Sequence, residues 1–472
     1  MRRFGIFVRG EFQHTGDSYE IRDPFDGEVV ARVERGGPEV VEGAIGDACG
    51  VAAEMAALPG YRKSAILARM RDGLAARMDE LTEVIRAEAG KPVRFARIEV
   101  ERCLDTFADA SEVARHEGGE LLNLDAFPPG AGRVGMVRRV PVGPVSAITP
   151  FNFPLNLVAH KVAPAIAAGC PVVLKPASQT PSAALILGEL AAEAGLPPGG
   201  LSVIPCSRAG AGAFTTDDRL RLLTFTGSPE VGWALKALAG RKKVVLELGG
   251  NAAAIVEPDA DLDAAAAKLA GGAYYYAGQS CISVQRIFVH RAVADAFRDR
   301  LVAAVENVPF GATADEGCVS GPVIDGSNAE RIEAWIGEAR QRGGRLLTGG
   351  DRTGNVIRPC LLEDTPGDCA VVAREAFGPV ANLYSHDHFD GALARVNDSR
   401  FGLQAGVFTS DVRKLTQALA TLEVGAVVHD DSPAYRVDHM PYGGVKESGI
   451  GREGARYAVE DMTEPRMLVL QT

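Results

Sequence analysis

The sequence predicts an α/β protein built from two α/β domains and a small β arm. Between residues 142 and 247, short apolar strands alternate with helical segments, and a second stretch of the same kind runs from about 252 to 430. Alternation at this spacing is typical of βαβ units and of a mostly parallel sheet. The chain has 472 residues, which is enough for two or three domains.

The remaining segments have other patterns. Residues 5–33 alternate apolar and polar side chains around turn signals, which predicts short strands or hairpins. Residues 39–115 are rich in Ala, Arg and Glu with helical periodicity, so several helices are expected there. Pro128-Pro129-Gly130 ends that pattern before a strand-like segment, and the chain after Gly454 returns to an extended one. These last two segments are the expected arm.

Composition excludes several classes of function. Apolar residues make up 46% of the chain and charged residues 24%, as in ordinary globular proteins. The net charge is −11, which argues against a nucleic-acid or anionic-membrane surface. An anionic substrate is still possible, because one or two arginines can dominate a pocket.

The cysteines and the N-terminus favour a soluble cytoplasmic protein. Eight cysteines are scattered without a CxxC pair, which fits neither a zinc site nor a secreted disulfide framework. The N-terminal segment has arginines but no apolar core, so it is not a signal peptide. No uncharged apolar run approaches the roughly 18 residues of a membrane span.

One cysteine has the surroundings of a nucleophile. Cys281 lies in Gly278-Gln279-Ser280-Cys281, among small residues that permit close backbone approach and supply N–H donors. The other seven cysteines are interpreted as small structural side chains. Candidate partners of Cys281 are weak when taken singly: Asn152 between two aromatic residues, Glu247 before two glycines, and Glu375 and Phe377 in EAFGPV.

Taken together and in this order, these segments resemble the aldehyde dehydrogenase superfamily along essentially the whole chain. The family resemblance rests on seven motifs, namely TPFNFP (149–154), KPASQTP (175–181), FTGSPEVG (225–232), LELGG (246–250), GQSC (278–281), EAFGPV (375–380) and PYGGVKESGIGREG (441–454). The short N-terminus, the NLVAHKVAP stretch and RVDHMPYGGVK look most like the branch that handles small hydroxy- or acid-bearing aldehydes, such as lactaldehyde and semialdehydes.

The resemblance implies the aldehyde dehydrogenase fold and its arrangement of domains. Residues 1–122 and 142–248 would form a Rossmann-like dinucleotide-binding domain, residues 249–454 the catalytic domain, and residues 123–141 and 455–472 the oligomerisation arm. Subunits of the family pair through such an arm, so we expect a homodimer or homotetramer. Apolar edge strands in the two arm segments agree, since they need covering.

The resemblance also assigns chemical roles. Cys281 would attack the aldehyde carbon, while the Asn152 side-chain amide and the Cys281 backbone N–H would bind the oxyanion. Hydride would pass to NAD(P), and Glu247 would be the general base that hydrolyses the thioester. Family members that transfer the acyl group to coenzyme A generally lack this Glu, so a free acid is expected. A catalytically inactive relative is disfavoured because Cys281, Asn152 and Glu247 are all present.

The cofactor site is expected at the turn in LLTFTGSPEVG. An apolar strand ends at Thr226-Gly227-Ser228, and a helix begins with Pro at its first position and Gly232 in its first turn, as a phosphate-binding helix start requires. The alternative is an ordinary strand-to-helix turn. A GxGxxG match at 449–454 is rejected, because no strand precedes it as the dinucleotide fingerprint demands.

NADP is expected as the preferred cofactor, with NAD as the alternative. Lys175 matches the family's adenosine-ribose ligand, and Ser178 stands where NAD-preferring members often carry a Glu. A hydroxyl can donate to a 2′-phosphate, which a carboxylate would repel. By the same resemblance, Glu375 would hold the nicotinamide ribose, and Phe377 and Phe151 would pack nearby.

The substrate end of the site is expected just before the PYGG motif. Arg436 could form a bidentate pair with an acid group of the substrate, or could be neutralised by Asp438 or Asp431. Arg102, on a helix, is a weaker candidate for the same anion. The expected substrate is therefore a small hydroxy- or acid-bearing aldehyde, and the alternative is a broad range of small aliphatic aldehydes.

Several other polar residues are interpreted as structural. Lys161 and Lys446 lie in or near family motifs but are assigned no chemistry, and Arg286 follows Cys281 on a strand. His386 and His388 flank Asp387 and are expected to be exposed to solvent. With no third ligand in view, no metal is predicted.

Overall fold

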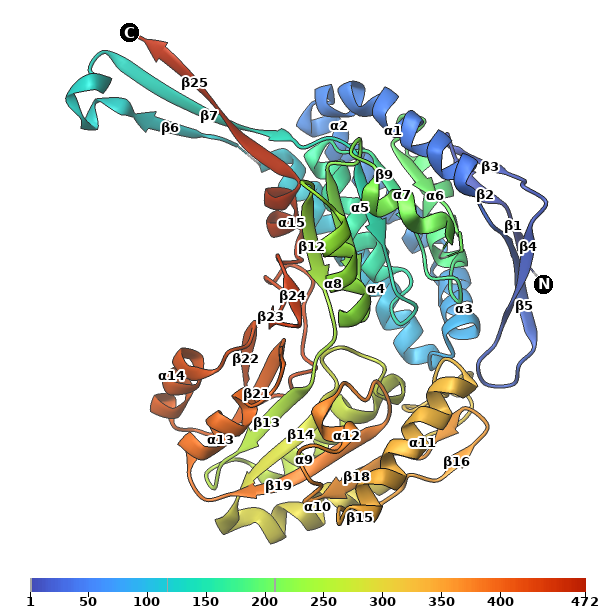
Figure 1. The fold of residues 1–472 in the computed structure, drawn as a ribbon, viewed down its shortest axis with the longest axis vertical. Helices are drawn as coiled ribbons and strands as arrows, with labels where there is room; N and C mark the ends of the chain where they lie inside the picture. Colours follow the sequence, from blue (N-terminus) through green and yellow to red (C-terminus); the bar gives the residue numbers. More distant parts are fainter. Residues whose placement is uncertain (1, 117, 208) are drawn as a thin grey trace.

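The computed structural model describes residues 2–116, 118–207 and 209–472. Two α/β bodies lie one above the other, and a three-stranded arm projects from the upper one in Figure 1. The α/β class is as predicted. Within the described residues, no helix is both long enough and apolar enough to cross a membrane.

The first body is organised around an eight-stranded sheet in the order β24-β12-β11-β8-β9-β10-β2-β3. Its five central strands are parallel, and the outer three are antiparallel to their neighbours. In chain order the strands are β2 (Ile6–Val8), β3 (Glu11–Gln13), β8 (Val145–Ile148), β9 (Val172–Lys175), β10 (Leu201–Val203), β11 (Leu222–Thr226), β12 (Lys243–Glu247) and β24 (Gly449–Ile450).

Helices cover this sheet, and four of them fill the Ala-rich segment as predicted. The helices of the first body are α1 (Pro38–Ala57), α2 (Gly60–Ala76), α3 (Met78–Ala89), α4 (Val93–His116), α5 (Asn156–Ala168), α6 (Ser182–Glu193), α7 (Gly212–Thr216), α8 (Pro229–Leu238) and α15 (Ala455–Asp461). All 13 residues of α5 are buried, so this apolar helix lies at the centre of the body. A separate small sheet contains β1 (Arg2–Phe4), β4 (Ser18–Arg22) and β5 (Val29–Glu34).

The second body contains a seven-stranded sheet in the order β15-β18-β19-β14-β13-β21-β22, parallel except for β15. Its strands are β13 (Ala252–Val256), β14 (Val284–His290), β15 (Arg345–Thr348), β18 (Cys360–Glu363), β19 (Val380–His386), β21 (Gln404–Phe408) and β22 (Ala426–His429). Its helices are α9 (Leu262–Tyr274), α10 (Ala294–Glu306), α11 (Gly326–Gln341), α12 (Ala370–Ala373), α13 (Phe389–Asn397) and α14 (Val412–Thr421). Apolar clusters cover both faces of this sheet, as a parallel sheet requires.

Short elements complete the two bodies. The two-stranded ladders pair β16 (Arg352–Thr353) with β17 (Val356–Ile357), and β20 (Phe401–Gly402) with β23 (Val445–Lys446). The 3-10 turns are η1 (Leu124–Ala126), η2 (Pro128–Gly130), η3 (Ala209–Ala211), η4 (Tyr275–Gly278) and η5 (Arg291–Val293).

The arm is an antiparallel sheet with β7 (Arg133–Pro141) between β6 (Glu120–Asn123) and β25 (Thr463–Gln471). β7 and β25 pair over nine residues each. Large apolar side chains on this sheet are exposed, among them Leu121, Met136 and Leu468.

Two elements lie away from the units in which the sequence boundaries placed them. β24, within the range expected for the catalytic domain, pairs with β12 of the first sheet. α15, within the range expected for the arm, packs against α5 and α4. In both cases the element packs in a different unit from its neighbours in the sequence. The domain boundaries themselves remain a prediction.

The two bodies meet at opposite ends of their sheets. In the first sheet, β8, β11 and β12 lead from their carboxyl ends into the segments around Phe151, Gly227 and Leu248. In the second, β14 and β19 are preceded by the segments around Cys281 and Glu375. Because parallel strands share a direction, residues remote in sequence converge between the two sheets.

Candidate active site

A cavity of about 620 Å³ lies between the two sheets. Nine of the residues predicted for the site line it together: Phe151, Asn152, Thr226, Gly227, Ser228, Glu247, Cys281, Glu375 and Phe377. The remaining predicted residues, Lys175, Ser178, Gly232, Arg102 and Arg436, lie outside its wall.

The loop that carries Cys281 has an unusual backbone. Tyr276, Ala277 and Gly278 all adopt left-handed conformations, with φ of 49°, 54° and 68°. Two of these are ordinary L-residues, for which the conformation is strained and persists only when the surroundings enforce it. The Tyr276 hydroxyl donates to the Ala89 carbonyl at 3.0 Å, which ties this turn to the first body. At Gly250 a β-carbon would lie 2.1 Å from the Cys281 carbonyl oxygen, so only glycine allows the loop to approach so closely.

The Cys281 thiol faces the cavity and contacts one hydroxyl. Its Sγ lies 3.2 Å from the Oη of Tyr442. Burial raises the pKa of Cys281 to about 12, and the hydrogen bond from Tyr442 acts in the opposite direction. Of the other seven cysteines, six are buried and Cys49 is half-buried, and all eight are free thiols.

Asn152 is buried and points at the Cys281 loop. Its Nδ2 donates to the backbone carbonyl of Gln279 at 3.0 Å. An amide nitrogen has two N–H groups, so one holds the loop and the other is available to a ligand. The arrangement brings an amide donor beside the thiol, as an oxyanion site requires.

Glu247 ends β12 with a buried carboxyl group. Among the described residues, neither of its oxygens has a hydrogen-bond partner. Burial, followed by the negative charge of Glu453, raises the pKa of Glu247 well above its usual value. A β-carbon at Gly443 would lie 2.8 Å from Glu247 Oε1, so the glycine leaves room for the carboxyl group. A raised pKa makes the carboxylate a stronger base once it is ionised.

The turn between β11 and α8 has the features of a phosphate-binding helix start. Pro229 occupies the first turn of α8, and Ser228 makes no side-chain cap hydrogen bond. The first N–H groups of the helix are therefore not capped by that hydroxyl and can face an anion. A β-carbon at Gly227 would lie 2.5 Å from the Phe225 ring, so a side chain here would have to displace the ring.

Gly232 lies in the first turn of α8, outside the cavity wall. It is buried, and a β-carbon there would lie 2.4 Å from the Leu248 side chain. Its small size lets α8 pack closely on the segment that follows β12. The approach of Gly232 to the cofactor stays a prediction.

Glu375 and the two phenylalanines form the opposite wall of the cavity. Glu375 Oε1 accepts a hydrogen bond from the Gly250 N–H at 3.0 Å. Burial raises the pKa of Glu375 to about 7, against the effects of that N–H and of Arg331. The Phe151 and Phe377 rings meet edge to face with centroids 5.8 Å apart.

Lys175 and Ser178 lie at the same carboxyl edge of the first sheet, beyond the cavity wall. Lys175 ends β9 next to β8, and its carbonyl accepts the Thr149 N–H at 3.1 Å. Lys175 is half-buried and Ser178 is exposed. Both are placed so that a dinucleotide extending from the cavity across β8 would meet them.

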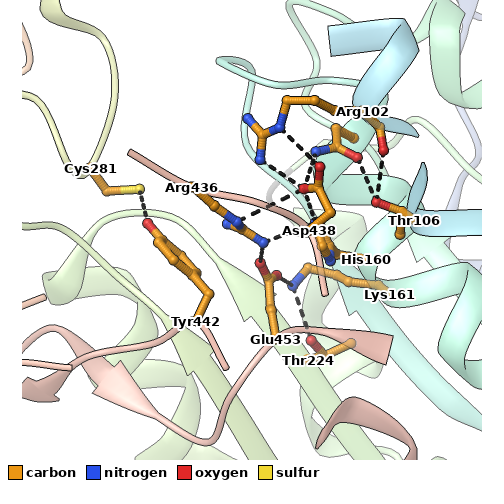
Figure 2. Close-up of polar contacts among 11 residues, drawn as sticks. Arg102, Thr106, His160, Lys161, Thr224, Cys281, Arg436, Asp438, Tyr442 and Glu453 are labelled. Carbon is orange, nitrogen blue, oxygen red and sulfur yellow. Dashed lines mark hydrogen bonds and ion pairs between the residues drawn. The ribbon is translucent and has the colours of Figure 1, made fainter. Parts of the chain in front are cut away.

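The two candidate arginines belong to a buried ionic network, drawn in Figure 2. Arg102 donates to both oxygens of Asp438, at 3.0 and 2.7 Å. Arg436 donates to Glu453 at 2.9 Å, and its Nε is 4.0 Å from Asp438. The charged members of this ionic network are Arg102, Lys161, Arg436, Asp438 and Glu453, with His160 between them.

Carboxylates of the network stay ionised. Although burial opposes it, hydrogen bonding to His160 and the charge of Arg102 hold the pKa of Asp438 below its usual value. Lys161, His160 and Arg436 likewise overcome burial and lower the pKa of Glu453 to about 2. Asp438 thus faces both arginines. One alternative expected for Arg436, neutralisation by Asp438, is therefore present, whereas Asp431 pairs with Lys268 instead.

Most of the residues interpreted as structural have structural contacts. Arg286 donates to the carbonyls of Asn251, Arg395 and Val396. Lys446 donates to two carbonyls of the segment before β20. The Gly449–Gly454 match runs from β24, the edge strand beside β12, to the short helix α15, and it lies outside the cavity wall.

The expectation for His386 was wrong. Its side chain is buried, with Nε2 3.3 Å from Glu257 Oε1, because it ends β19 in the middle of the sheet. His388, two residues later, is exposed as expected. No group of three or more His, Cys, Asp or Glu side chains suited to a metal ion occurs among the described residues.

Several cavity residues have no signal in the sequence. Arg331 and Trp335 come from α11, Arg374 and Arg400 from loops of the second body, and Phe401 from β20. Their spacing resembles that of any surface helix or loop. Tyr442 stood within a quoted motif, but nothing in that motif indicates contact with Cys281.

This constellation defines a class of enzyme. A thiol, a side-chain amide and a buried carboxyl share one cavity with an anion-binding helix start, as expected of a nicotinamide-dependent dehydrogenase with a cysteine nucleophile. The chain belongs to the aldehyde dehydrogenase family, whose family model matches residues 12–468. It is an oxidoreductase that oxidises aldehydes to carboxylic acids with NAD(P), as predicted.

Known proteins resemble the chain over its full length. The 3-sulfolactaldehyde dehydrogenase of Priestia megaterium is 41% identical over 471 residues, covering 100% of this chain and 98% of the relative. The crystal structure of aldehyde dehydrogenase 21 from Physcomitrella patens, in complex with the reaction product succinate, superposes with a TM-score of 0.98 at 44% identity, covering 100% and 98% of the two chains. The NADP-dependent glyceraldehyde-3-phosphate dehydrogenase of Bacillus halodurans, complexed with NADP, gives 0.96 at 33% identity, covering 99% of each chain.

Proposed function

We propose that the enzyme oxidises a small aldehyde that carries an acid group, a carboxylate or a sulfonate, at its far end. The observation that carries this proposal is the charge of the ionic network beside Tyr442 and Cys281. Its three cations face only two carboxylates. Burial lowers the pKa of His160 and raises that of Glu247, which favours the neutral form of both. One positive charge remains for a substrate anion to neutralise.

Arg102 is the better placed of the two arginines to meet that anion. Its side chain is 24% exposed, whereas that of Arg436 is only 7% exposed. Arg102 uses Nε and Nη2 on Asp438, and its guanidinium has further N–H groups. We therefore assign Arg102 to direct contact with the substrate acid group, and Arg436 to the positive potential behind it.

The similar proteins support this substrate class. One relative is named for an aldehyde with a sulfonate group, and a solved relative holds succinate, a dicarboxylate. Both names describe small acid-bearing molecules. Neither describes the unsubstituted aliphatic aldehydes of the alternative function.

In the proposed mechanism, the chain's own groups act in sequence. The Cys281 thiolate attacks the aldehyde carbon, and the free N–H of the Asn152 amide stabilises the oxyanion that forms. NAD(P), when bound, would supply the hydride acceptor, and loss of hydride from the carbon on Cys281 would leave an acyl thioester there. Glu247 then removes a proton from the water that attacks the thioester, and the carboxylic acid leaves as Cys281 is restored. The presence of Glu247 favours this hydrolysis over transfer to coenzyme A.

NAD(P) fits the cavity that the residues form. The uncapped start of α8 suits a phosphate. Gly227 leaves space for a close approach of the backbone to the cofactor. The carboxyl group of Glu375, on the cavity wall, suits a ribose. We infer a preference for NADP because Ser178 is a neutral donor at the expected position of a 2′-phosphate. Ser178→Glu should move the kinetic preference toward NAD by about tenfold or more, since a carboxylate repels the phosphate. A more than tenfold preference for NAD in the wild type would contradict the inference.

We also propose that the arm joins subunits into a homodimer or a homotetramer. Its sheet presents a run of exposed apolar side chains, Met467, Leu468, Val469 and Leu470, on an edge strand. Such an edge favours pairing with another chain. The eight free thiols, one of them the nucleophile, agree with a reducing compartment such as the cytoplasm.

Steady-state rates with three aldehydes test the substrate. Succinic semialdehyde, lactaldehyde and a neutral aliphatic aldehyde of similar length would be compared with NADP and then NAD. We expect Arg102→Gln to lower kcat/KM for the acid-bearing aldehyde by about 10- to 100-fold, the range for a charged hydrogen bond. The neutral aldehyde should be little affected.

Arg97→Gln is the matched control. Arg97 lies on the same helix, and its side chain is 42% exposed and pairs with Asp79. Equal rates for neutral and acid-bearing aldehydes in the wild type would instead favour a broad small-aldehyde dehydrogenase.

A further inference from the structure

The hydroxyl of Tyr442 is a hydrogen-bonding partner of the nucleophile. Its Oη lies 3.2 Å from Cys281 Sγ, and the Tyr442 side chain is buried. In the thiol form either group can donate. Once Cys281 has lost its proton, sulfur can only accept, so the hydroxyl must be the donor. Burial raises the pKa of Tyr442 well above its usual value, so the hydroxyl retains its proton.

A cation lies on the face of the same ring. The Arg436 guanidinium carbon is 3.7 Å from the Tyr442 ring centroid, a close cation–π contact. A positive charge on the ring face withdraws electron density, which makes the phenol a stronger donor. Figure 2 shows Arg436 beside Tyr442, with the Cys281–Tyr442 hydrogen bond on one side and the Arg436–Glu453 ion pair on the other.

Glu453 fixes both members of this arrangement. Its backbone exchanges two hydrogen bonds with that of Tyr442, at 3.1 and 2.6 Å. Its side chain accepts from Arg436 Nη2 at 2.9 Å. Glu453 therefore holds both the Tyr442 ring and the Arg436 guanidinium in place.

The thiolate needs such a donor because burial disfavours the charged form of Cys281, and the charge of Glu375 on the cavity wall does so as well. Arg436 favours a negative sulfur, but its guanidinium lies over the face of the Tyr442 ring. The Tyr442 hydroxyl is the donor that reaches the sulfur itself.

We propose that Tyr442 is a catalytic residue that donates a hydrogen bond to the Cys281 thiolate, and that Arg436 is a positioning residue acting through the Tyr442 ring. Tyr442 transfers no proton at any step. When sulfur bonds to the aldehyde carbon, its charge moves to the carbonyl oxygen, and the hydrogen bond to sulfur weakens. This inference rests on the proposed role of Cys281 as the nucleophile.

The test is the rate at which iodoacetamide inactivates the enzyme between pH 6 and pH 10. Loss of activity reports Cys281 specifically, although seven other cysteines are present. Removing the donor in Tyr442→Phe should raise the thiol pKa by about one pH unit, because a hydrogen bond to the charged form favours that form. Nucleophilicity rises with pKa with a Brønsted coefficient of about 0.4–0.5, so alkylation below the thiol pKa should slow about three- to fourfold.

Because burial raises the thiol pKa of Cys281 to about 12, the whole range lies below it, and Tyr442→Phe should be alkylated more slowly at every pH. Tyr435→Phe makes the same change seven residues away, at a side chain that is 48% exposed, and should leave the profile unchanged. Identical profiles for Tyr442→Phe and wild type would overturn the proposal. So would faster alkylation of Tyr442→Phe at neutral pH.

Arg436 is tested through the same profile. Arg436→Gln should slow alkylation in the wild type, but should cause no further change in Tyr442→Phe, because the ring hydroxyl that transmits its effect is then absent. Arg436→Lys keeps the charge and should restore part of the rate if the Gln variant folds poorly. Equal effects of Arg436→Gln in both backgrounds would contradict positioning through Tyr442.

Cys281→Ser separates this inference from the proposed function. If Cys281→Ser retains dehydrogenase activity that iodoacetamide still abolishes, the nucleophile is another residue and the proposed mechanism fails. If Cys281→Ser is inactive and Tyr442→Phe has the wild-type profile, only the role of Tyr442 fails.

Discussion

The Asn152 side chain donates a hydrogen bond to the backbone carbonyl of Gln279, two residues before Cys281. Asn152 follows β8 of the first body, and Gln279 belongs to the loop of the second. One buried contact therefore sets the position of the thiol relative to the expected cofactor site. In the proposed mechanism, the amide that holds the loop is also the amide that stabilises the oxyanion.

Asn152→Ala should lower kcat/KM about 10²–10³-fold, the usual cost of losing one oxyanion donor. Steady-state rates measure this loss, and the rate of iodoacetamide inactivation separates the two tasks of the amide. If Asn152 acts mainly on the oxyanion, Cys281 should be alkylated at the wild-type rate. Alkylation that falls as far as turnover would show that Asn152 mainly positions the loop.

Glu247→Gln should preserve a burst of reduced cofactor and slow the following steady state about 10²–10⁴-fold, because only thioester hydrolysis needs the base. A base acts when deprotonated, and burial together with Glu453 raises the pKa of Glu247. Wild-type kcat should therefore rise with pH as Glu247 loses its proton, wherever hydrolysis limits turnover. Stopped-flow traces between pH 6 and pH 9 check both points. Full steady-state activity in the variant would remove Glu247 from the mechanism.

Residues at strand ends were predictable because chain order alone places them. Thr226 and Glu247 each end a parallel strand, so the motifs that contain them had to meet at one edge of the sheet. The small residues before Cys281 indicated a tight loop in the same way. Nine predicted residues share the cavity for this reason.

The ionic network was not predictable as a unit. Arg102 comes from α4, His160 from α5, and Arg436 and Glu453 from the loops on either side of Tyr442. Only tertiary packing brings these segments together, and no periodicity encodes it. The prediction for His386 was wrong for a related reason, because nothing in its residue pattern indicates that β19 is an interior strand. The left-handed run at Tyr276 and Ala277 likewise has no signature in residue type.

Leu468→Glu should weaken subunit association, because it places a charge in the exposed apolar row of β25, where Leu468 is 55% exposed. Light scattering coupled to size exclusion should show a smaller mass at micromolar concentration. Leu419→Glu is the control, since Leu419 on α14 is 73% exposed but lies outside the arm. Equal masses for both variants and wild type would place the subunit interface elsewhere.

Asp438→Asn should destabilise the protein more than the loss of a charge at any exposed side chain. The reason is that Asp438 is the buried carboxylate that faces both arginines. Removing one partner of a buried pair typically costs about 3–5 kcal/mol, and the lower end applies since Arg102 is partly exposed. Burial opposes ionisation, but His160 and Arg102 depress the pKa of Asp438 below its unfolded value.

A depressed pKa means that the stabilisation from Asp438 is fully present above the unfolded pKa of about 3.9, and is lost as pH falls toward the folded one. The first urea transition of wild type and Asp438→Asn should therefore differ strongly at pH 7 and less at pH 3.5. Asp387→Asn, which removes an exposed partner of Arg291, should change the transition little at either pH. A difference between wild type and Asp438→Asn that stays constant down to pH 3.5 would mean that shape and hydrogen bonding, rather than the charge of Asp438, hold the network together.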